Sequence, residues 1–197
     1  MKKKKFIKKN IYEAIVIGSS AGGLNALLQI IPKISKNFNI PIIIVQHTSP
    51  VIDSTLADIL NNRSVLKVKE ADEKEKIESG CIYIAPPDYH LLIEKDKTIS
   101  FSNEVKKNFS RPSIDVLFES AAEIYFDKLI GIILTGANKD GAIGLKKIKE
   151  YGGYTIVQDP KDAEVDIMPI AAIETAEVDT ILTLDRISDL LNRLSNM

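Results

Sequence analysis

Apolar and polar residues form alternating blocks along the chain, and the blocks indicate strands and helices that follow one another. Short uninterrupted apolar runs are typical of strands that are buried on both faces. These runs lie at residues 13–18, 41–46, 129–136 and 154–158. Segments with helical spacing separate them, at residues 22–31, 54–62, 113–126 and 141–150. The pattern predicts an α/β fold with a doubly wound, mainly parallel sheet.

One stretch departs from this alternation. Residues 81–102, CIYIAPPDYHLLIEKDKTISFS, contain three short strand-like pieces around a Pro-Pro-Asp turn and a Lys-Asp-Lys turn, and they predict an antiparallel excursion at a sheet edge. Further on, Pro169 is expected in the first turn of a helix, where proline is tolerated. We expect one domain over residues 13–197, preceded by a basic N-terminal extension over residues 1–12.

Composition excludes several classes of protein. The 26 Lys and Arg residues balance 27 Asp and Glu residues, so no basic field predicts a nucleic-acid partner. No run approaches the roughly 20 apolar residues of a membrane span, so no membrane insertion is expected. The only cysteine, Cys81, is expected in a strand and indicates a reducing compartment, which favours a cytoplasmic protein. No spacing of His and Cys residues predicts a metal site.

The turn after the first strand, Gly18-Ser19-Ser20-Ala21-Gly22-Gly23, carries the candidate chemistry. A phosphate-binding turn of a dinucleotide enzyme needs G-x-G-x-x-G and an acidic residue at the end of the second strand. The glycines are spaced differently here, and the second strand ends in Gln46-His47. The same turn matches G-x-S-x-G, which presents a serine on a sharp strand-to-helix turn. Ser20 is therefore the candidate nucleophile, with a structural glycine turn as the alternative.

A base and an orienting carboxylate are expected at neighbouring strand ends. His47 follows the second strand, whereas His90 lies in the edge excursion and is expected to be structural. Asp140 follows the strand that ends near Gly136, where a plain helix N-cap is the alternative role. Strand ends converge in an open α/β sheet, so these turns predict a Ser-His-Asp triad. The order Ser, His, Asp differs from that of ordinary α/β-hydrolases.

At these residues the sequence resembles the catalytic domain of the CheB family, the chemotaxis protein-glutamate methylesterases. The stretches that carry the resemblance are IGSSAGGLNAL, IVQHTSP, YIAPPDYHLLI, RPSIDVLF and ILTGANKDGAIGL. The resemblance implies a hydrolase that demethylates glutamate methyl esters on methyl-accepting chemoreceptors or other methylated proteins, with possible deamidation of glutamines. It assigns the triad to Ser20, His47 and Asp140, and the oxyanion hole to the amides of Ala21 and Ala137. It implies no metal and no organic cofactor.

Two departures from the family pattern shape the expectations. The family turn T-G-M-G-x-D-G reads TGANKDG here, so Asn138 stands where the family has glycine. Asn tolerates positive φ well, and the turn is expected to persist with altered substrate contacts. Only residues 1–12 precede the first strand, so the family's receiver domain is expected to be absent. The enzyme is then expected to be constitutively open, to be controlled by a separate regulatory protein, or to act outside chemotaxis. Arg111 is a candidate contact to an acidic receptor helix, with a plain loop arginine as the alternative. The alternative function is a catalytically weak CheB-like binding or scaffold module.

Overall fold

The structure is a computed structural model that describes residues 12–47 and 53–195. Most of the predicted basic extension, residues 1–11, and the segment 48–52 lie outside the described residues. Within the described part of the chain, seven strands form one sheet in the order β3-β4-β2-β1-β7-β8-β9, and every neighbouring pair is parallel. Two further strands form an antiparallel pair, β5-β6.

The strands are short, and those at the centre of the sheet are buried along their whole length. Their bounds are β1 Ala14–Ser19, β2 Ile42–Gln46, β3 Lys67–Glu70, β4 Cys81–Ile84, β5 His90–Ile93, β6 Ile99–Ser102, β7 Leu129–Ile133, β8 Tyr154–Gln158 and β9 Thr180–Leu182. The helices between them are α1 Gly23–Ile30, α2 Asp53–Asn61, α3 Ile114–Tyr125, α4 Ala142–Glu150, α5 Ile167–Thr175 and α6 Leu184–Ser195. Short 3₁₀ turns follow α1 at Ile31–Lys33 and α3 at Phe126–Lys128.

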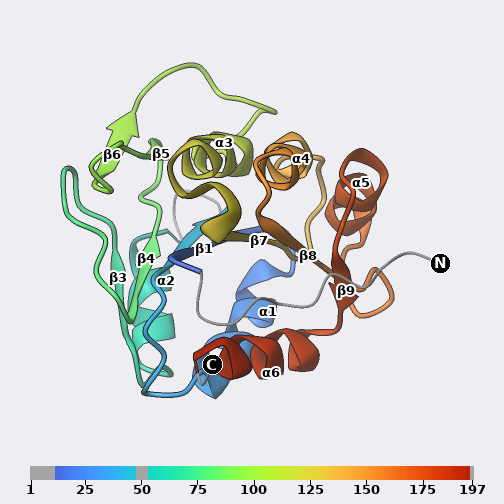
Figure 1. Ribbon diagram of the computed structural model, residues 1–197, viewed down its shortest axis with the longest axis horizontal. Helices are drawn as coiled ribbons and strands as arrows, with labels where there is room; N and C mark the ends of the chain where they lie inside the picture. Colours follow the sequence, from blue (N-terminus) through green and yellow to red (C-terminus); the bar gives the residue numbers. More distant parts are fainter. Residues whose placement is uncertain (1–11, 48–52, 196–197) are drawn as a thin grey trace.

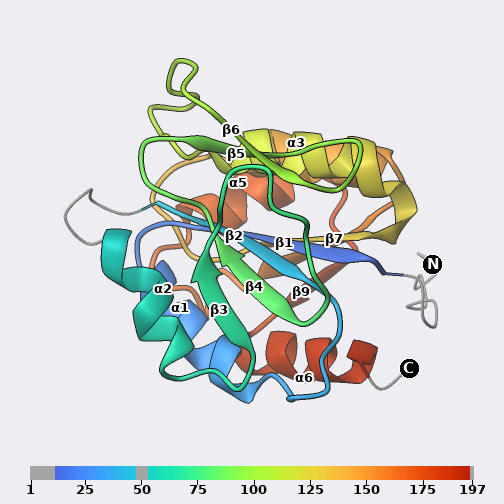
Figure 2. The same ribbon diagram turned by 90° about the vertical axis from the view of Figure 1, so that its left-hand side faces the viewer.

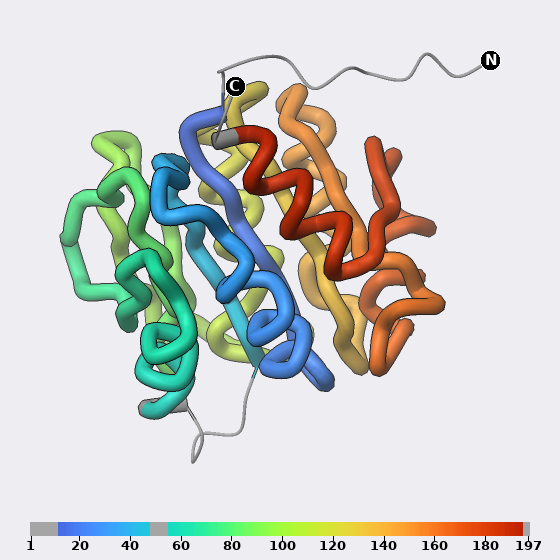
Figure 3. The backbone as a smooth tube through the Cα atoms, turned by 90° about the horizontal axis from the view of Figure 1, so that it is seen from below, coloured from blue at the N-terminus to red at the C-terminus, as the bar shows by residue number. Residues whose placement is uncertain are grey.

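Helices cover both faces of the sheet, which explains why the central strands have no polar face. In Figure 1, α3, α4 and α5 lie above the sheet, while α1 and α6 lie below it. Figure 3 views the lower face, where α1, α2 and α6 lie in front of the strands. Each face buries its own apolar cluster, one centred on Leu27, Ile44 and Leu191 and the other on Val16, Phe118 and Leu145.

The predicted doubly wound α/β fold is confirmed, and the excursion is more specific than the sequence indicated. The piece CIYI does not leave the main sheet, because β4 pairs in parallel with both β2 and β3. Only β5 and β6 form the antiparallel hairpin, and it packs beside α3 above the sheet (Figure 2). Pro169 lies in the first turn of α5, which begins two residues earlier than the proline.

Candidate active site

Three neighbouring strands, β2, β1 and β7, end at one edge of the sheet. Ser19, the last residue of β1, lies opposite Gln46, the last residue of β2. The pairing continues beyond the strands, since His47 N donates to Ser19 O at 2.9 Å and Ser20 N donates to Thr135 O at 3.0 Å. Ser20 therefore follows β1 between the chain segments that carry His47 and Thr135. Helix α1, which follows β1, covers one face of the sheet, and helix α4, which follows β7, covers the other (Figure 1). Open α/β sheets form their sites at such a switch between neighbouring strands.

Gln46 holds the turn that carries Ser20. The Gln46 amide donates to Ser20 O at 2.8 Å, and its oxygen accepts a hydrogen bond from Ser19 Oγ at 2.6 Å. Gly23 N also donates to Ser20 O, at 2.8 Å, and a Cβ on Gly23 would lie 1.9 Å from Gln46 Oε1. Gly22 has a φ of 77°, which favours glycine. The G-x-S-x-G pattern thus corresponds to a tight turn that leaves no room for side chains at these glycines.

His47 and Asp140 come together although they lie in different strand-end turns. His47 Nε2 lies 3.0 Å from Asp140 Oδ2, and the two side chains are 10% and 0% exposed. The distance is that of an ion pair, but the Nε2–H direction is not aligned for a hydrogen bond. The other ring nitrogen, Nδ1, faces Asn138 Nδ2 at 3.3 Å and Ser110 Oγ at 3.4 Å. His47 is therefore held between a carboxylate and two neutral polar groups.

The Asp140 carboxylate fills the N-terminus of helix α3. It accepts hydrogen bonds from four donors within the described residues: Asn108 Nδ2 at 2.9 Å, Ser113 Oγ at 2.9 Å, Ile114 N at 2.6 Å and Asp115 N at 3.3 Å. The predicted alternative role, an N-cap for its own helix α4, does not apply, because the residue before α4 is Gly141, with no side-chain cap. The carboxylate caps α3 instead.

Burial and hydrogen bonding act on Asp140 in opposite directions. Burial by itself raises the pKa of Asp140, but the contacts with His47, the Asn108 amide and Ile114 N outweigh it, so that the pKa of Asp140 is lowered. An ionised Asp140 is the form that favours a positive charge on His47.

A second buried carboxylate, Asp115, lies beside the first. The Asn108 amide donates to Asp115 Oδ2 at 2.9 Å as well as to Asp140, and Gly144 N donates to Asp115 Oδ1 at 2.7 Å. Burial raises the pKa of Asp115 to about 6; the Gly144 hydrogen bond opposes this rise and the Asp140 charge adds to it. Sequence reasoning missed Asp115 as part of the site. The signal was its place on the apolar face of α3, three residues before Phe118.

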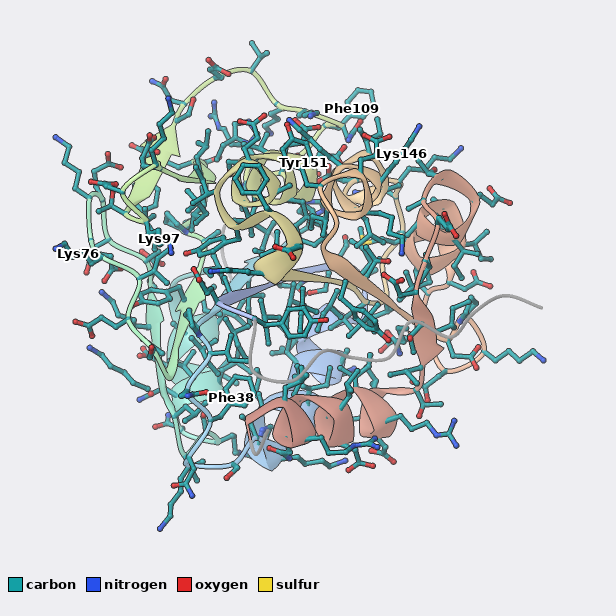
Figure 4. All side chains as sticks on the ribbon, viewed as in Figure 1. Phe38, Lys76, Lys97, Phe109, Lys146 and Tyr151 are labelled. Carbon is teal, nitrogen blue, oxygen red and sulfur yellow. The ribbon has the colours of Figure 1, made fainter. Side chains whose placement is uncertain are left out.

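The loop between β6 and α3 brings Asn108 to these carboxylates. Asn108 and Phe109 both have positive φ, 50° and 64°, and Lys107 and Ser110 pair across them. Positive φ is costly for Phe. Phe109 is 97% exposed and points away from the body of the protein above α3 and α4 (Figure 4). The Asn108 contacts hold this loop in place.

The remaining parts of the predicted site are the Ser20 hydroxyl and the two proposed oxyanion donors, the amides of Ala21 and Ala137. Within residues 12–47 and 53–195, the Ser20 hydroxyl makes no hydrogen bond, and the amides of Ala21 and Ala137 donate none. Both alanines are exposed, and the Thr135 hydroxyl lies 2.9 Å from Ala21 O. The structure therefore brings His47 and Asp140 into contact and places Ser20 on the adjoining strand end, without a Ser20–His47 hydrogen bond among the described residues.

Comparison with known proteins identifies the family of the chain. The family model described as CheB methylesterase matches residues 15–191. The chain belongs to the CheB methylesterase family. A Leptospira interrogans protein provisionally named protein-glutamate methylesterase/protein-glutamine glutaminase is 60% identical, over 93% of this chain and 95% of the relative. The crystal structure of the Thermotoga maritima CheB methylesterase catalytic domain has a TM-score of 0.89 and 41% identity, covering 93% of this chain and 98% of that one.

Other CheB relatives are longer. A Carboxydothermus hydrogenoformans protein-glutamate methylesterase/protein-glutamine glutaminase is 43% identical over 92% of this chain, which spans 55% of that relative. The Thermotoga maritima protein of the same name is 42% identical over 91% of this chain, which spans 53% of it. The chain thus corresponds to about half of these two relatives.

The structure corrects the expectation for Asn138 and adds a structural role for Arg111. Asn138 does not adopt positive φ, so tolerance of that conformation does not explain its presence. Arg111 Nη1 donates to the carbonyls of Asn103 and Glu104 at 2.9 and 3.1 Å, and its Nε is buried without a hydrogen bond to a described residue. Arg111 therefore holds the β6–α3 loop, whatever else it contacts.

The other two singled-out residues are structural. His90 is 2% exposed; its Nδ1 accepts a hydrogen bond from Ser113 N and its Nε2 lies 3.2 Å from Val105 O. Cys81 is buried in β4, as predicted. In the part of the chain that the structure describes, no group of three His, Cys, Asp or Glu side chains is arranged to hold a metal ion, and no helix is long and apolar enough to cross a membrane.

Proposed function

We propose that the protein is a serine hydrolase that demethylates glutamate methyl esters on chemoreceptor-type proteins, using Ser20, His47 and Asp140. The observation that carries the proposal is the 3.0 Å contact between His47 and a buried, multiply hydrogen-bonded Asp140, next to the turn that presents Ser20. Membership of the CheB methylesterase family supports the choice of ester.

The reaction follows from the roles of these side chains. Ser20 Oγ attacks the γ-carbonyl carbon of the glutamyl ester, and its proton passes to His47 Nδ1, the nitrogen that does not face Asp140. The ionised Asp140 stabilises the resulting imidazolium. The C–O bond to methoxide breaks, and His47 returns the proton to form methanol. Water then hydrolyses the acyl-enzyme with His47 as base, leaving a glutamate carboxylate and free Ser20.

The oxyanion is proposed to bind the amides of Ala21 and Ala137. Both N–H groups lack a partner among the described residues, and Ala21 lies at the positive end of helix α1. Each such donor typically contributes roughly 100-fold or more to the rate. The side chain of Ala137 is small, so the methionine of the family turn has no counterpart at this position.

The proposal also covers the substrate protein, its contact with Arg111, the location and the regulator. The substrate is a methyl-accepting chemoreceptor or another methylated protein, and glutamine deamidation by the same acyl-enzyme route is included. Arg111 is proposed to contact an acidic substrate helix with the guanidinium N–H groups that do not bind the loop carbonyls. A cytoplasmic location rests on the single, buried cysteine. A separate regulatory protein stays a prediction.

Methanol release from methylated chemoreceptor membranes tests the activity, with wild type compared with Ser20→Ala. The expected result is release by wild type that is lost in Ser20→Ala. Release that persists in Ser20→Ala would refute the assignment of the nucleophile. A receiver-free CheB catalytic domain assayed on the same membranes shows that the substrate is competent, so that absence of release by wild type counts against the proposed activity.

One observation favours the alternative of a weak catalyst that serves as a binding or scaffold module. The Ser20 hydroxyl is not paired with His47 within the described residues. A covalent serine-directed probe separates the two functions. An activated Ser20 reacts with the probe and Ser20→Ala does not, whereas a scaffold module leaves wild type unlabelled.

A further inference from the structure

Asn138 makes two contacts that together orient its amide. Its Oδ1 accepts a hydrogen bond from Asp140 N at 3.0 Å, as in an Asx turn, and this leaves Nδ2 as the end that faces His47 Nδ1 at 3.3 Å. An amide nitrogen only donates hydrogen bonds. The ring nitrogen that it faces must therefore offer a lone pair, which places the proton of a neutral His47 on Nε2.

The contact with Asp140 favours the same tautomer but does not fix the ring. The carboxylate attracts a protonated Nε2, yet the N–H direction is not aligned with Oδ2. Ser110 Oγ, 3.4 Å from Nδ1, either donates or accepts and so does not select a tautomer. Among the described neighbours of Nδ1, Asn138 is the one that can only donate, so it is the one that selects a tautomer of His47. Its negative φ also means that its backbone does not require Asn.

We propose that Asn138 is a positioning residue that holds His47 in the Nε2–H tautomer, with the Nδ1 lone pair directed to the site. The inference rests on the proposed role of His47 as the general base. It assigns a task to a residue at which this chain departs from the family turn. In the resting site the Asn138 amide occupies the single lone pair of Nδ1 and keeps that nitrogen unprotonated, and it releases the lone pair when Ser20 delivers its proton.

The test is ¹⁵N NMR of the imidazole nitrogens at about pH 8, where a histidine is ordinarily neutral. In wild type, His47 Nδ1 is expected to give the signal of an unprotonated nitrogen and Nε2 that of a protonated one. His90 is an internal standard, because Ser113 N donates to its Nδ1 and Val105 O can only accept from its Nε2. A protonated Nδ1 in wild-type His47 would overturn the inference.

Asn138→Asp supplies the sharper comparison. One carboxylate oxygen can still accept from Asp140 N, while the other replaces the donor that faces Nδ1 with an acceptor. Nδ1 is then expected to carry a proton in addition to the one on Nε2, because both ring nitrogens face carboxylates. Without a free lone pair on His47, kcat should be lower by roughly 100-fold, the usual contribution of a general base, with KM changed less than about twofold. Lys139→Gln changes the net charge by the same amount at the exposed neighbouring position, and it should leave the His47 signals and kcat unchanged.

The outcomes separate this inference from the proposed function. An Asn138→Asp protein with wild-type His47 signals would refute the positioning role, even if wild type releases methanol. Conversely, wild type without esterase activity but with the expected tautomer, lost in Asn138→Asp, would refute the proposed function and support the role of Asn138. The His90 signals should be unchanged in every variant, which shows that the fold is intact.

Discussion

The N-termini of helices α1 and α3 lie at the same edge of the sheet, but the chain finishes them in opposite ways. Helix α1 follows a left-handed glycine, has no side-chain cap and no acidic residue in its first turn, and comes shortly after the exposed residue Ala21. Helix α3 receives the buried Asp140 carboxylate, which binds Ile114 N at 2.6 Å. Each helix end is a favourable place for negative charge. The Asp140 carboxylate fills the α3 terminus, whereas the amide of Ala21, just before α1, makes no hydrogen bond to a described residue and is the proposed oxyanion donor.

The difference explains how one edge of the sheet can hold Asp140 rigidly and still present Ser20 as the proposed nucleophile. The filled terminus fixes Asp140, and Asp140 contacts His47 without belonging to its strand. At the α1 terminus, the turn that carries Ser20 is held by Gln46 and by the Thr135 hydroxyl, both of which donate to backbone carbonyls. Substitutions at the α1 terminus should therefore change activity more than stability, while substitutions at the α3 terminus should change both.

The largest effect on activity is expected for Ser20→Ala. Loss of the proposed nucleophile should lower kcat for methanol release by roughly 10⁴-fold or more. The free energy of unfolding should change by less than about 0.5 kcal/mol, since no described residue hydrogen-bonds to the Ser20 hydroxyl. Denaturant unfolding of the two proteins measures this second quantity. A Ser20→Ala protein destabilised by several kcal/mol would show that the α1 terminus is a structural element rather than an open site.

Asp140→Asn should affect both quantities. The rate is expected to fall about 10⁴-fold, because His47 loses its charged partner. One oxygen becomes a donor that faces the donors at the start of α3, and an unsatisfied buried donor costs about 1–3 kcal/mol. Activity and urea unfolding of the same sample check the pair of effects. If activity falls while stability is retained, the carboxylate is not what completes the α3 terminus.

The sequence predicted which residues lie at this edge of the sheet, but not how the α3 terminus is completed. Apolar runs identify parallel strands, and the residues after such strands, Ser20, His47 and Asp140, must gather at one edge. Local pattern could not show that Asp140 would cap α3 rather than α4, because that choice depends on how two distant segments dock. Asn108 was also beyond prediction, since its polar loop has no periodicity.

Asn138 illustrates the same limit. Its type was explained from backbone preference, whereas the structure gives it a backbone that any residue adopts and a side chain that bonds across the site. Similarly, the run CIYI carries no mark that distinguishes a strand of the parallel sheet from a hairpin strand. The partner strand decides, and that partner, β2, lies almost forty residues earlier in the chain.

Asn108→Gly tests how much the Asn108 amide contributes to the two carboxylates at the α3 terminus. Glycine accepts the positive φ of 50°, so the substitution removes the amide and leaves the backbone unstrained. The loss of its hydrogen bonds to Asp115 and Asp140 should cost about 1 kcal/mol and raise the pKa of Asp140, which the amide lowers. Carboxyl ¹³C NMR titration and urea unfolding measure the two effects. Asp88→Gly, an exposed position with a φ of 60°, is the control for the entropy that any added glycine introduces.

Asp115→Asn should change the pH dependence of stability, with no effect expected on the proposed catalytic groups. Burial raises the pKa of Asp115 to about 6 in the fold, from an ordinary value near 4 in the unfolded chain. Between these values the folded protein binds more protons than the unfolded one, so Asp115 makes stability fall as pH rises from about 4 through about 6. The lowered pKa of Asp140 acts oppositely, and its stabilisation is lost only as pH falls.

Asp115→Asn should therefore give a free energy of unfolding that declines less over pH 4–6, by roughly 1–3 kcal/mol across the window. Chemical unfolding at a series of pH values measures the slope, which is insensitive to any constant cost of the substitution. An unchanged slope would mean that Asp115 is ionised at low pH like Asp140, and that the α3 terminus holds two negative charges rather than one.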